Sequence, residues 1–260
     1  MDLPRRSLFV WQLAPVVAAE GSAEAIACKA GALSIDGLFV KIAEGIHPYR
    51  NMEGPTGAAL AGLRRHCADR GIALWGWHLP RCATEDDATG ESAVVAEIAD
   101  RLALDGLIMD AEPGAGFFRG GMGAAHRYGD AMRGLADRLG VPLGICGPAL
   151  PSADPSWPDR FGVIAAHAVV SFPQVHYDDE RSIEGFLAET EVENARFGLP
   201  IIPVGTAWVG EDGCASEQSC AARAAEFSRL CALRGHPGCA FWHWASAPAA
   251  FWNVLAALQP

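Results

Sequence analysis

Asp105-Gly106-Leu107-Ile108-Met109-Asp110-Ala111-Glu112-Pro113-Gly114 joins an apolar run to two carboxylates and then closes with Pro and Gly. An apolar run such as 107–109, flanked by helical patterns, is typical of a buried strand in a parallel sheet. Side chains alternate along a strand, so Asp110 and Glu112 face the same way at its C-terminal end. Charges beside a low-dielectric core are costly, so this pair indicates a functional site.

Strand and helix patterns alternate on both sides of this stretch, with no change of composition between units. Such alternation predicts a parallel sheet with right-handed crossovers. Eight units in 260 residues predict a single (β/α)8 TIM barrel over residues 1–260. The alternative, an open doubly wound sheet, would carry a glycine fingerprint after its first strand, and this chain has none there. The predicted strands are 7–13, 37–43, 72–77, the opening stretch, 142–146, 169–176, 201–207 and 238–244, and the predicted helices are 22–33, 56–70, 91–104, 128–139, 158–167, 182–195, 216–233 and 251–258.

Composition excludes several classes of partner. The formal net charge is −11 and no Lys/Arg run occurs, which argues against nucleic acid and anionic membranes. No apolar stretch reaches the length of a bilayer span. The eight cysteines form no Cys-x-x-Cys pair, which argues against a zinc knuckle. Dispersed cysteines suit a reducing compartment, and a Cys214–Cys220 bridge is the alternative.

The N-terminal segment has two interpretations. Arg5-Arg6 followed by the apolar run 7–11 is similar to the start of an export signal, and 17–19 is similar to a cleavage site. We favour a first core strand, because cleavage would remove a strand that the barrel needs. We therefore expect a cytoplasmic protein, with secretion or association with a phage as alternatives.

The C-terminal strand ends are where a barrel of this kind carries its active site. Five of the eight tryptophans, at positions 75, 77, 208, 242 and 244, lie at or near these ends. Pockets are typically walled by aromatic side chains with a few fixed polar groups, and flat aromatic walls beside carboxylates suit a sugar. The predicted substrate-binding residues are Gln12, Lys41, Glu44, Trp77, His78, Gln174, His176, Tyr177, Asp178, Trp208 and Trp242, beside the catalytic candidates Asp110 and Glu112.

Some of these candidates have structural alternatives. Asp178 opens an Asp-Asp-Glu run that would also suit a solvated turn. His176 would equally suit a core histidine bonded to a neighbouring Gln or Asp. Trp75 and Trp244 are the tryptophans most suited to packing beneath the helices.

The carboxylate pair predicts acid–base chemistry. Neighbouring carboxylates repel, which separates their pKa values and leaves one protonated acid beside one anion, as glycoside hydrolysis requires. Glu112 is the predicted general acid/base; the alternative is a structural carboxylate paired with Lys41. Asp110 is the predicted nucleophile or stabilising group; the alternative is an ion pair or a backbone cap. Adjacent in-facing positions place the carboxyls about 5–7 Å apart, nearer the retaining spacing.

A metal site is the competing chemistry. Asp110, Glu112, His78 and His176 could converge on a divalent ion. No His-x-His or His-Glu-x-x-His pattern supports this, so no metal or cofactor is expected. The glycines of 114–121 indicate a flexible loop, because no Gly-Lys-Ser/Thr follows as in a phosphate cradle.

The same residues resemble two families of glycoside hydrolase barrels. Lys41-Ile42-Ala43-Glu44-Gly45, Gly76-Trp77-His78 and Asp110-Ala111-Glu112 resemble the ends of the second, third and fourth strands of family 25 lysozymes, which are N-acetylmuramidases. The chitinase-type family 18 motif on the fourth strand is similar at positions 105, 106, 110 and 112, and that family also resembles this chain at Tyr177-Asp178 and Trp242. The resemblance implies Glu112 as proton donor, with Asp110 and Tyr177 supporting the substrate's N-acetyl group as internal nucleophile.

Two positions depart from these families. Gln12 stands where family 25 has an acidic residue, and Ile108 stands where family 18 has an aspartate. We expect a glycoside hydrolase that cleaves β-linked N-acetylated amino-sugar polymers, such as peptidoglycan or chitin, with retention. The two departures motivate the alternative, a catalytically inactive barrel that binds saccharide or a protein.

Overall fold

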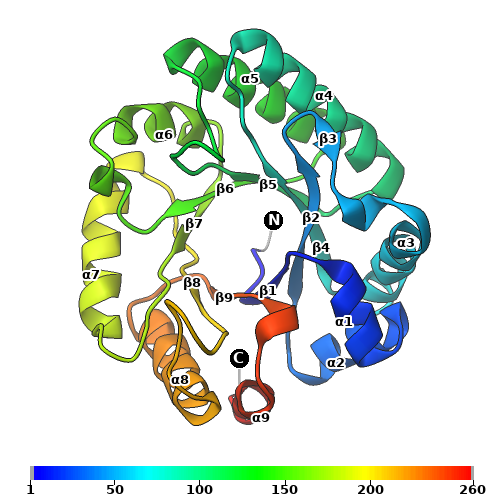
Figure 1. The fold of residues 1–260 in the computed structure, drawn as a ribbon, viewed down its shortest axis with the longest axis vertical. Helices are drawn as coiled ribbons and strands as arrows, with labels where there is room; N and C mark the ends of the chain where they lie inside the picture. The colour runs from blue at the N-terminus through cyan, green and yellow to red at the C-terminus, as the bar shows by residue number, and fades with distance from the viewer. Residues whose placement is uncertain (1–2, 259–260) are drawn as a thin grey trace.

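The computed structural model describes residues 3–258, and in this range eight parallel strands close into a barrel (Figure 1). Strand β1 pairs with β2 on one side and with β9 on the other, which closes the sheet. The predicted single (β/α)8 barrel is confirmed. The barrel strands are β1 (Arg6–Val10), β2 (Gly37–Glu44), β4 (Ala73–Leu79), β5 (Gly106–Asp110), β6 (Leu143–Pro148), β7 (Val170–Gln174), β8 (Val204–Thr206) and β9 (Cys239–Trp242), and β3 (His47–Pro48) pairs antiparallel with the end of β2.

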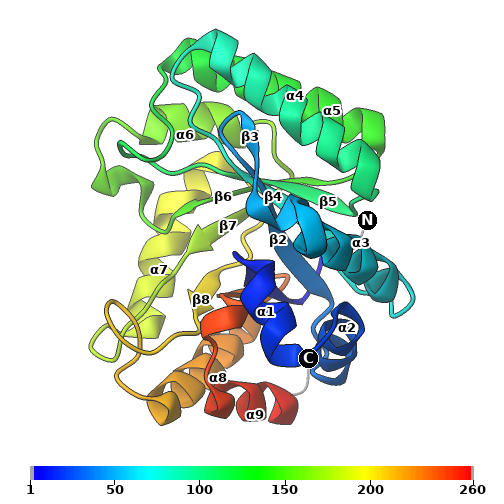
Figure 2. The ribbon, with the colours of Figure 1, turned by 45° about the vertical axis from the view of Figure 1, so that its right-hand side comes forward.

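Helices surround the barrel, and Figure 2 shows α4 and α5 side by side along one flank. Within residues 3–258, none of the helices combines the length and the apolar character that crossing a bilayer requires. The α-helices are α1 (Leu13–Glu20), α2 (Ala23–Ala32), α3 (Gly54–Ala68), α4 (Glu85–Leu102), α5 (Met122–Leu139), α6 (Pro158–Ala165), α7 (Ile183–Asn194), α8 (Glu217–Leu233) and α9 (Ala249–Ala257), with short 3-10 turns at Arg50–Met52, Pro151–Ala153, Ala195–Phe197 and Trp244–Ser246.

Several predicted boundaries differ from the structure, and two of the differences have local reasons. The first strand ends at Val10 because Gln12 is already the N-cap of α1, a helix that the sequence patterns did not reveal. Helix α4 begins at Glu85, ahead of the predicted 91, because Thr84 and Asp87 form a reciprocal capping box. Residues 6–10 of the possible export signal form a buried strand, and 17–19 lie within α1.

The lower part of the barrel is filled by aromatic side chains. Phe39 packs edge-on against Phe172 with ring centroids 5.1 Å apart, and Trp75 packs edge-on against Phe172 at 6.0 Å. A Cβ at Gly106 would collide with the Trp75 ring, so that glycine makes room for the indole. Trp75 therefore fills the barrel interior together with Phe39 and Phe172.

The cysteines take no part in cross-links. All eight are free thiols, including Cys214 and Cys220, so the structure does not contain the bridge considered as an alternative. Seven of them are buried, and Cys28 is exposed. Buried thiols of this kind pack as small hydrophobic groups.

Candidate functional site

A cavity of about 380 Å³ opens at the carboxyl ends of the strands. Six predicted site residues line it together: Lys41, Glu44, Trp77, Asp110, Glu112 and Trp242. Other lining residues were not predicted, namely Trp11, Tyr49, Arg50, Leu79, Gly116 and Phe117. We call this space the carboxylate cavity.

Asp110 and Glu112 form the acidic part of the carboxylate cavity. Asp110 is the last residue of β5 and is only 5% exposed. Burial, followed by the negative charge of Glu112, raises the pKa of Asp110 well above its usual value. Burial also raises the pKa of Glu112, against the opposing effects of Gln174 and Lys41. The pair therefore retains a proton at a higher pH than isolated carboxyls would.

One oxygen of Asp110 has no partner. Its Oδ1 atom is buried and accepts no hydrogen bond from the part of the chain that the structure describes. The salt bridges of that part of the chain also do not include Asp110, so the alternative of a structural ion pair finds no partner there. Buried polar atoms are almost always satisfied, and leaving one unpaired costs about 1–3 kcal/mol. A ligand donor reaching this oxygen would remove that penalty.

Glu112 is oriented from the neighbouring side of the barrel. Gln174, at the end of β7, donates from Nε2 to Oε1 of Glu112 across 3.0 Å. Lys41, the alternative partner of Glu112, instead forms its salt bridge with Glu44 at 2.8 Å. The Lys41 ammonium also lies 4.9 Å from the ring centroid of Trp77. Glu112 is thus held by a neutral amide, which leaves its carboxyl available for proton transfer.

Aromatic side chains form a wall of the carboxylate cavity beside the carboxylates. Trp11 stacks on Trp242 with an interplanar angle of 27° and centroids 6.4 Å apart. The ring centroids of Trp242 and Trp77 are 5.8 Å apart, so the three indoles are contiguous. Trp11 is 39% exposed and follows Phe9 on the inward face of its strand. Alternation from Phe9 puts Trp11 on the inward face, but the sequence prediction chose the neighbouring Gln12 at this strand end.

His176 and Trp208 extend this wall, although neither lines the carboxylate cavity itself. Their rings are packed edge-on with centroids 5.2 Å apart, and the centroids of the His176 and Trp242 rings are 6.5 Å apart. Burial lowers the pKa of His176 to about 4, so the imidazole is neutral at neutral pH. Its Nε2 atom is buried without a hydrogen-bond partner in the described chain.

The structure does not bring His78 to the cavity. On β4 the inward residues are Trp77 and Leu79, so His78 faces the helices. Its Nδ1 lies 2.8 Å from the Tyr128 hydroxyl and its Nε2 lies 3.1 Å from the carbonyl oxygen of Gly45. Burial lowers the pKa of His78 to about 4. It acts as a neutral structural residue, which the sequence pattern alone could not distinguish from a ligand-binding one.

Tyr177 also faces away from the cavity. Gln174 and His176 take the inward positions, so Tyr177 is fully buried and packs on Phe227 with centroids 5.3 Å apart. Its hydroxyl donates to the carbonyl oxygen of Thr206, at 3.4 Å. The support of an N-acetyl group that the family resemblance implied for Tyr177 is therefore not available from this position.

Asp178 and Gln12 have local roles. Asp178 accepts backbone hydrogen bonds from Glu180 and Arg181, as in the solvated turn considered above. Gln12 is the N-cap position of α1, and its side chain makes no capping hydrogen bond. Neither residue lines the carboxylate cavity.

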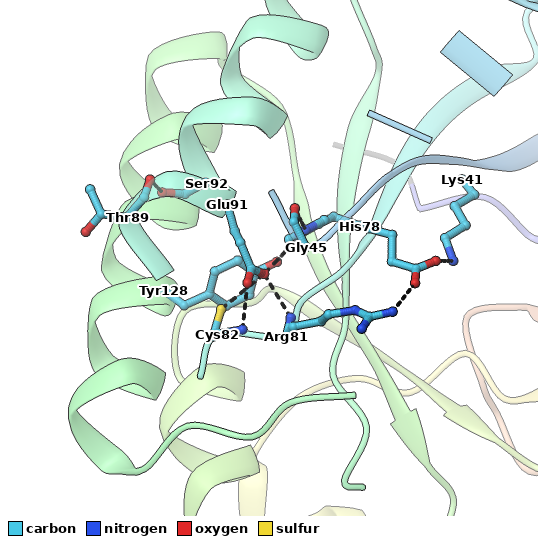
Figure 3. A network of polar contacts seen from close by, with 10 residues as sticks. Lys41, Gly45, His78, Arg81, Cys82, Thr89, Glu91, Ser92 and Tyr128 are labelled. Carbon is cyan, nitrogen blue, oxygen red and sulfur yellow. Dashed lines mark hydrogen bonds and ion pairs between the residues drawn. The ribbon is translucent and has the colours of Figure 1, made fainter. Parts of the chain in front are cut away.

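A buried polar network supports the rim of the cavity (Figure 3). The carboxylate of Glu91 on α4, 2% exposed, accepts backbone hydrogen bonds from Arg81 at 2.8 Å and Cys82 at 2.7 Å. The Arg81 guanidinium in turn donates to Glu44, which also accepts from Lys41. Glu91 and Arg81 were not predicted as site residues, since neither lies on a predicted strand end. Glu91 thereby fixes the loop that holds Glu44 and Lys41 in place.

The predicted metal ligands do not come together in the structure. Within residues 3–258, no three or more His, Cys, Asp and Glu side chains are grouped as metal ligands. His78, one of the four predicted ligands, is bound to Tyr128 and Gly45 on the helix side of β4.

Comparison with known proteins finds the same barrel fold in solved structures, at low sequence identity. No protein-family profile and no curated protein matches the sequence. Among solved structures, a GH18 chitinase from Pseudoalteromonas aurantia is similar with a TM-score of 0.68, 10% identity, and coverage of 97% of this chain and 99% of that one. An endo-beta-N-acetylglucosaminidase from Cordyceps militaris is similar with a TM-score of 0.65, 12% identity, and coverage of 100% and 92%. The spore cortex-lytic enzyme SleL from Bacillus megaterium is similar with a TM-score of 0.60, 10% identity, and coverage of 98% and 73%. At these identities the likeness establishes the shared barrel fold.

Proposed function

We propose that this chain is a glycosidase that cleaves β-linked N-acetylated amino-sugar polymers, with Glu112 as the general acid. The observation that carries the proposal is the pair formed by buried Asp110 and half-buried Glu112, whose pKa values are raised, at an aromatic-walled cavity. A general acid must be protonated at working pH, and a raised carboxyl pKa provides this. The solved structures with a similar barrel include a GH18 chitinase and an endo-beta-N-acetylglucosaminidase, which agrees with this substrate class.

The proposed first step is proton donation from Glu112 to the glycosidic oxygen as the bond to the anomeric carbon breaks. The acetamido oxygen of the same sugar attacks that carbon and forms a cyclic intermediate, and Asp110 stabilises the positive charge on the acetamido group. Water then opens the intermediate and gives its proton to Glu112, so the anomeric configuration is retained. Because Tyr177 faces away from the cavity, Asp110 carries the support of the acetamido group without it.

The unpaired Oδ1 atom of Asp110 fits this role. An acetamido N–H is a hydrogen-bond donor that would satisfy the buried oxygen when substrate is bound. The exposed Trp11 and the half-buried Trp242 form the aromatic surface beside the pair, suited to the apolar face of a pyranose ring, and the buried Trp77 packs against Trp242. Peptidoglycan and chitin both supply such N-acetylated rings.

A saccharide-binding barrel without turnover is the second candidate. Ile108 lies two residues before Asp110 and is completely buried inside the barrel. An aspartate there would exchange a proton or hydrogen bond with Asp110, whereas isoleucine offers neither. This candidate predicts binding of amino-sugar oligomers without release of products.

The test is release of reducing sugar from N-acetylglucosamine oligomers and from peptidoglycan. Wild type is compared with Glu112→Gln and with Glu97→Gln, a control on the exposed face of α4. The proposal expects release by wild type and Glu97→Gln and a loss of at least about 100-fold in Glu112→Gln. Binding without release by wild type would favour the second candidate, and neither binding nor release would reject both.

A further inference from the structure

A second cavity, of about 540 Å³, adjoins the carboxylate cavity. The two share Glu44, Tyr49 and Arg50 as lining residues. The second cavity continues outward between the β2–β3 hairpin, the loop after β4 and the loop after β5, where Arg81 and Arg119 lie. We call it the arginine cavity, after Arg50, Arg81 and Arg119.

The charges of the arginine cavity are unusual for this protein. Three of its lining residues are arginines, in a chain whose net charge is −11. Its acidic members are already engaged: Glu44 accepts from both Lys41 and Arg81, and Glu91 accepts from two backbone amides. The remaining carboxylate, Asp87, accepts the backbone amide of Thr84 in the capping box of α4.

Two of the arginines have no protein partner in the described part of the chain. The side chains of Arg50 and Arg119 are exposed and take part in none of its hydrogen bonds or salt bridges. The Arg50 guanidinium carbon lies 5.3 Å from the ring centroid of Tyr49. A guanidinium presents a planar fork of donors that matches a carboxylate.

Tyr49 supplies an independent indication of a ligand. It borders both cavities, is only 8% exposed, and its buried hydroxyl has no hydrogen-bond partner among residues 3–258. A buried hydroxyl without a partner carries a penalty that a ligand oxygen would relieve. The Lys41 ammonium lies 4.6 Å from the centroid of the Tyr49 ring, and Lys41 lines the carboxylate cavity together with Asp110 and Glu112. Tyr49 thus connects the proposed catalytic pair to the arginine cavity.

We propose that the arginine cavity binds a carboxylate borne by the saccharide substrate, so that the preferred substrate is an acidic amino-sugar chain. The inference rests on the proposed function, because the sugar ring must occupy the carboxylate cavity for its substituent to reach Arg50 and Arg119. A carboxylate substituent that extends outward past Tyr49 would lose bound water and gain charge-assisted hydrogen bonds from Arg50 and Arg119. Neutral chitin oligomers would still occupy the carboxylate cavity, but they have no carboxylate for Arg50 and Arg119 to bind.

The test compares two matched ligands by calorimetry. One is a peptidoglycan glycan fragment freed of its peptides, whose N-acetylmuramic acid residues carry free carboxylates. The other is the same fragment with those carboxyls converted to amides. Wild type should bind the acidic fragment about five- to tenfold more tightly, as expected for two partly exposed ion pairs. The preference should weaken as salt is added.

Variants assign the preference to this cavity. Arg119→Gln and Arg50→Gln should each reduce the acid-to-amide affinity ratio about two- to threefold, and the double variant should bring it to about one. Arg101→Gln, which removes an exposed arginine at the far end of α4, should keep the wild-type ratio. Equal binding of both fragments by wild type, or a preference that survives the double variant, would overturn the inference while leaving the proposed function intact. Failure of wild type to bind either fragment or N-acetylglucosamine oligomers would reject both.

Discussion

Nε2 of Gln174 on β7 donates to Oε1 of Glu112 across 3.0 Å, and so orients the proposed acid from a strand that lies two positions from β5 in the barrel. The hydrogen bond favours the ionised carboxylate and opposes the burial that raises the pKa of Glu112. Gln174→Ala should therefore raise that pKa further and shift the alkaline limb of the pH–rate profile to higher pH. The rate at the optimum should fall about tenfold as Glu112 loses its orientation. A fall in rate with an unchanged profile would contradict the electrostatic role.

Replacement of Asp110 should increase stability while it removes activity. Burial and Glu112 raise the pKa of Asp110 in the folded state. The stability associated with the neutral acid is therefore complete below the unfolded-state pKa of about 3.9 and is lost as pH rises through the folded-state pKa. Asp110→Asn mimics the neutral acid. It should raise the free energy of unfolding at neutral pH by about 1–3 kcal/mol, and by much less near pH 4.

Urea unfolding at the two pH values measures this difference. Glu226→Gln, on the exposed face of α8, is the control for loss of one negative charge. An Asp110→Asn protein that is less stable than wild type at neutral pH would show that Asp110 is a structural anion.

Glu91 should stabilise the folded protein and also position the rim of the carboxylate cavity. Glu91→Ala leaves the backbone amides of Arg81 and Cys82 without their acceptor. Unpaired buried donors cost about 1–3 kcal/mol each, so the free energy of unfolding should fall by about 2–4 kcal/mol. The KM for amino-sugar oligomers should rise, because Arg81 then holds Glu44 less firmly. A variant with wild-type stability would show that Glu91 does not hold this loop.

Trp11 should contribute to saccharide binding. It is 39% exposed and stacks on Trp242, so Trp11→Ala removes one face of the aromatic wall with little loss of core. The affinity for N-acetylglucosamine oligomers should fall about three- to tenfold. Trp252→Ala, which removes an indole that packs on Trp244 away from the cavity, should leave the affinity unchanged. Equal losses in both variants would indicate a general effect on folding.

The barrel and its two carboxylates could be predicted from the sequence. The barrel follows from the alternation of strand and helix patterns, and the carboxylate pair follows from the alternation of side chains along a strand. The run before Asp110 and the repeated strand–helix units set the fold, and the period of two places Asp110 and Glu112 on one face. The same alternation explains the errors at His78 and Tyr177. Each lies next to inward residues, Trp77 in one case and His176 in the other, and therefore faces outward.

Other residues of the site could not be predicted because they belong to loops. Tyr49, Phe117 and Arg119 line the cavities from loop segments. Tertiary packing sets the direction of these loops, and no periodic pattern in the sequence indicates that direction. Glu91 was hidden because helix α4 was started too late, at the residue itself. The wall residue Trp11 was missed because Gln12, which faces the other way, was taken as the site residue at the end of the first strand.

The most direct test of the central proposal, that Glu112 is a general acid raised in pKa by burial, is the initial rate of reducing-sugar release from N-acetylglucosamine oligomers between about pH 4 and pH 9. Wild type and Glu97→Gln should show an alkaline limb above the ordinary glutamate range, and Glu112→Gln should lose at least about 100-fold in rate while still binding the oligomers. Equal rates for Glu112→Gln and wild type would contradict the proposal.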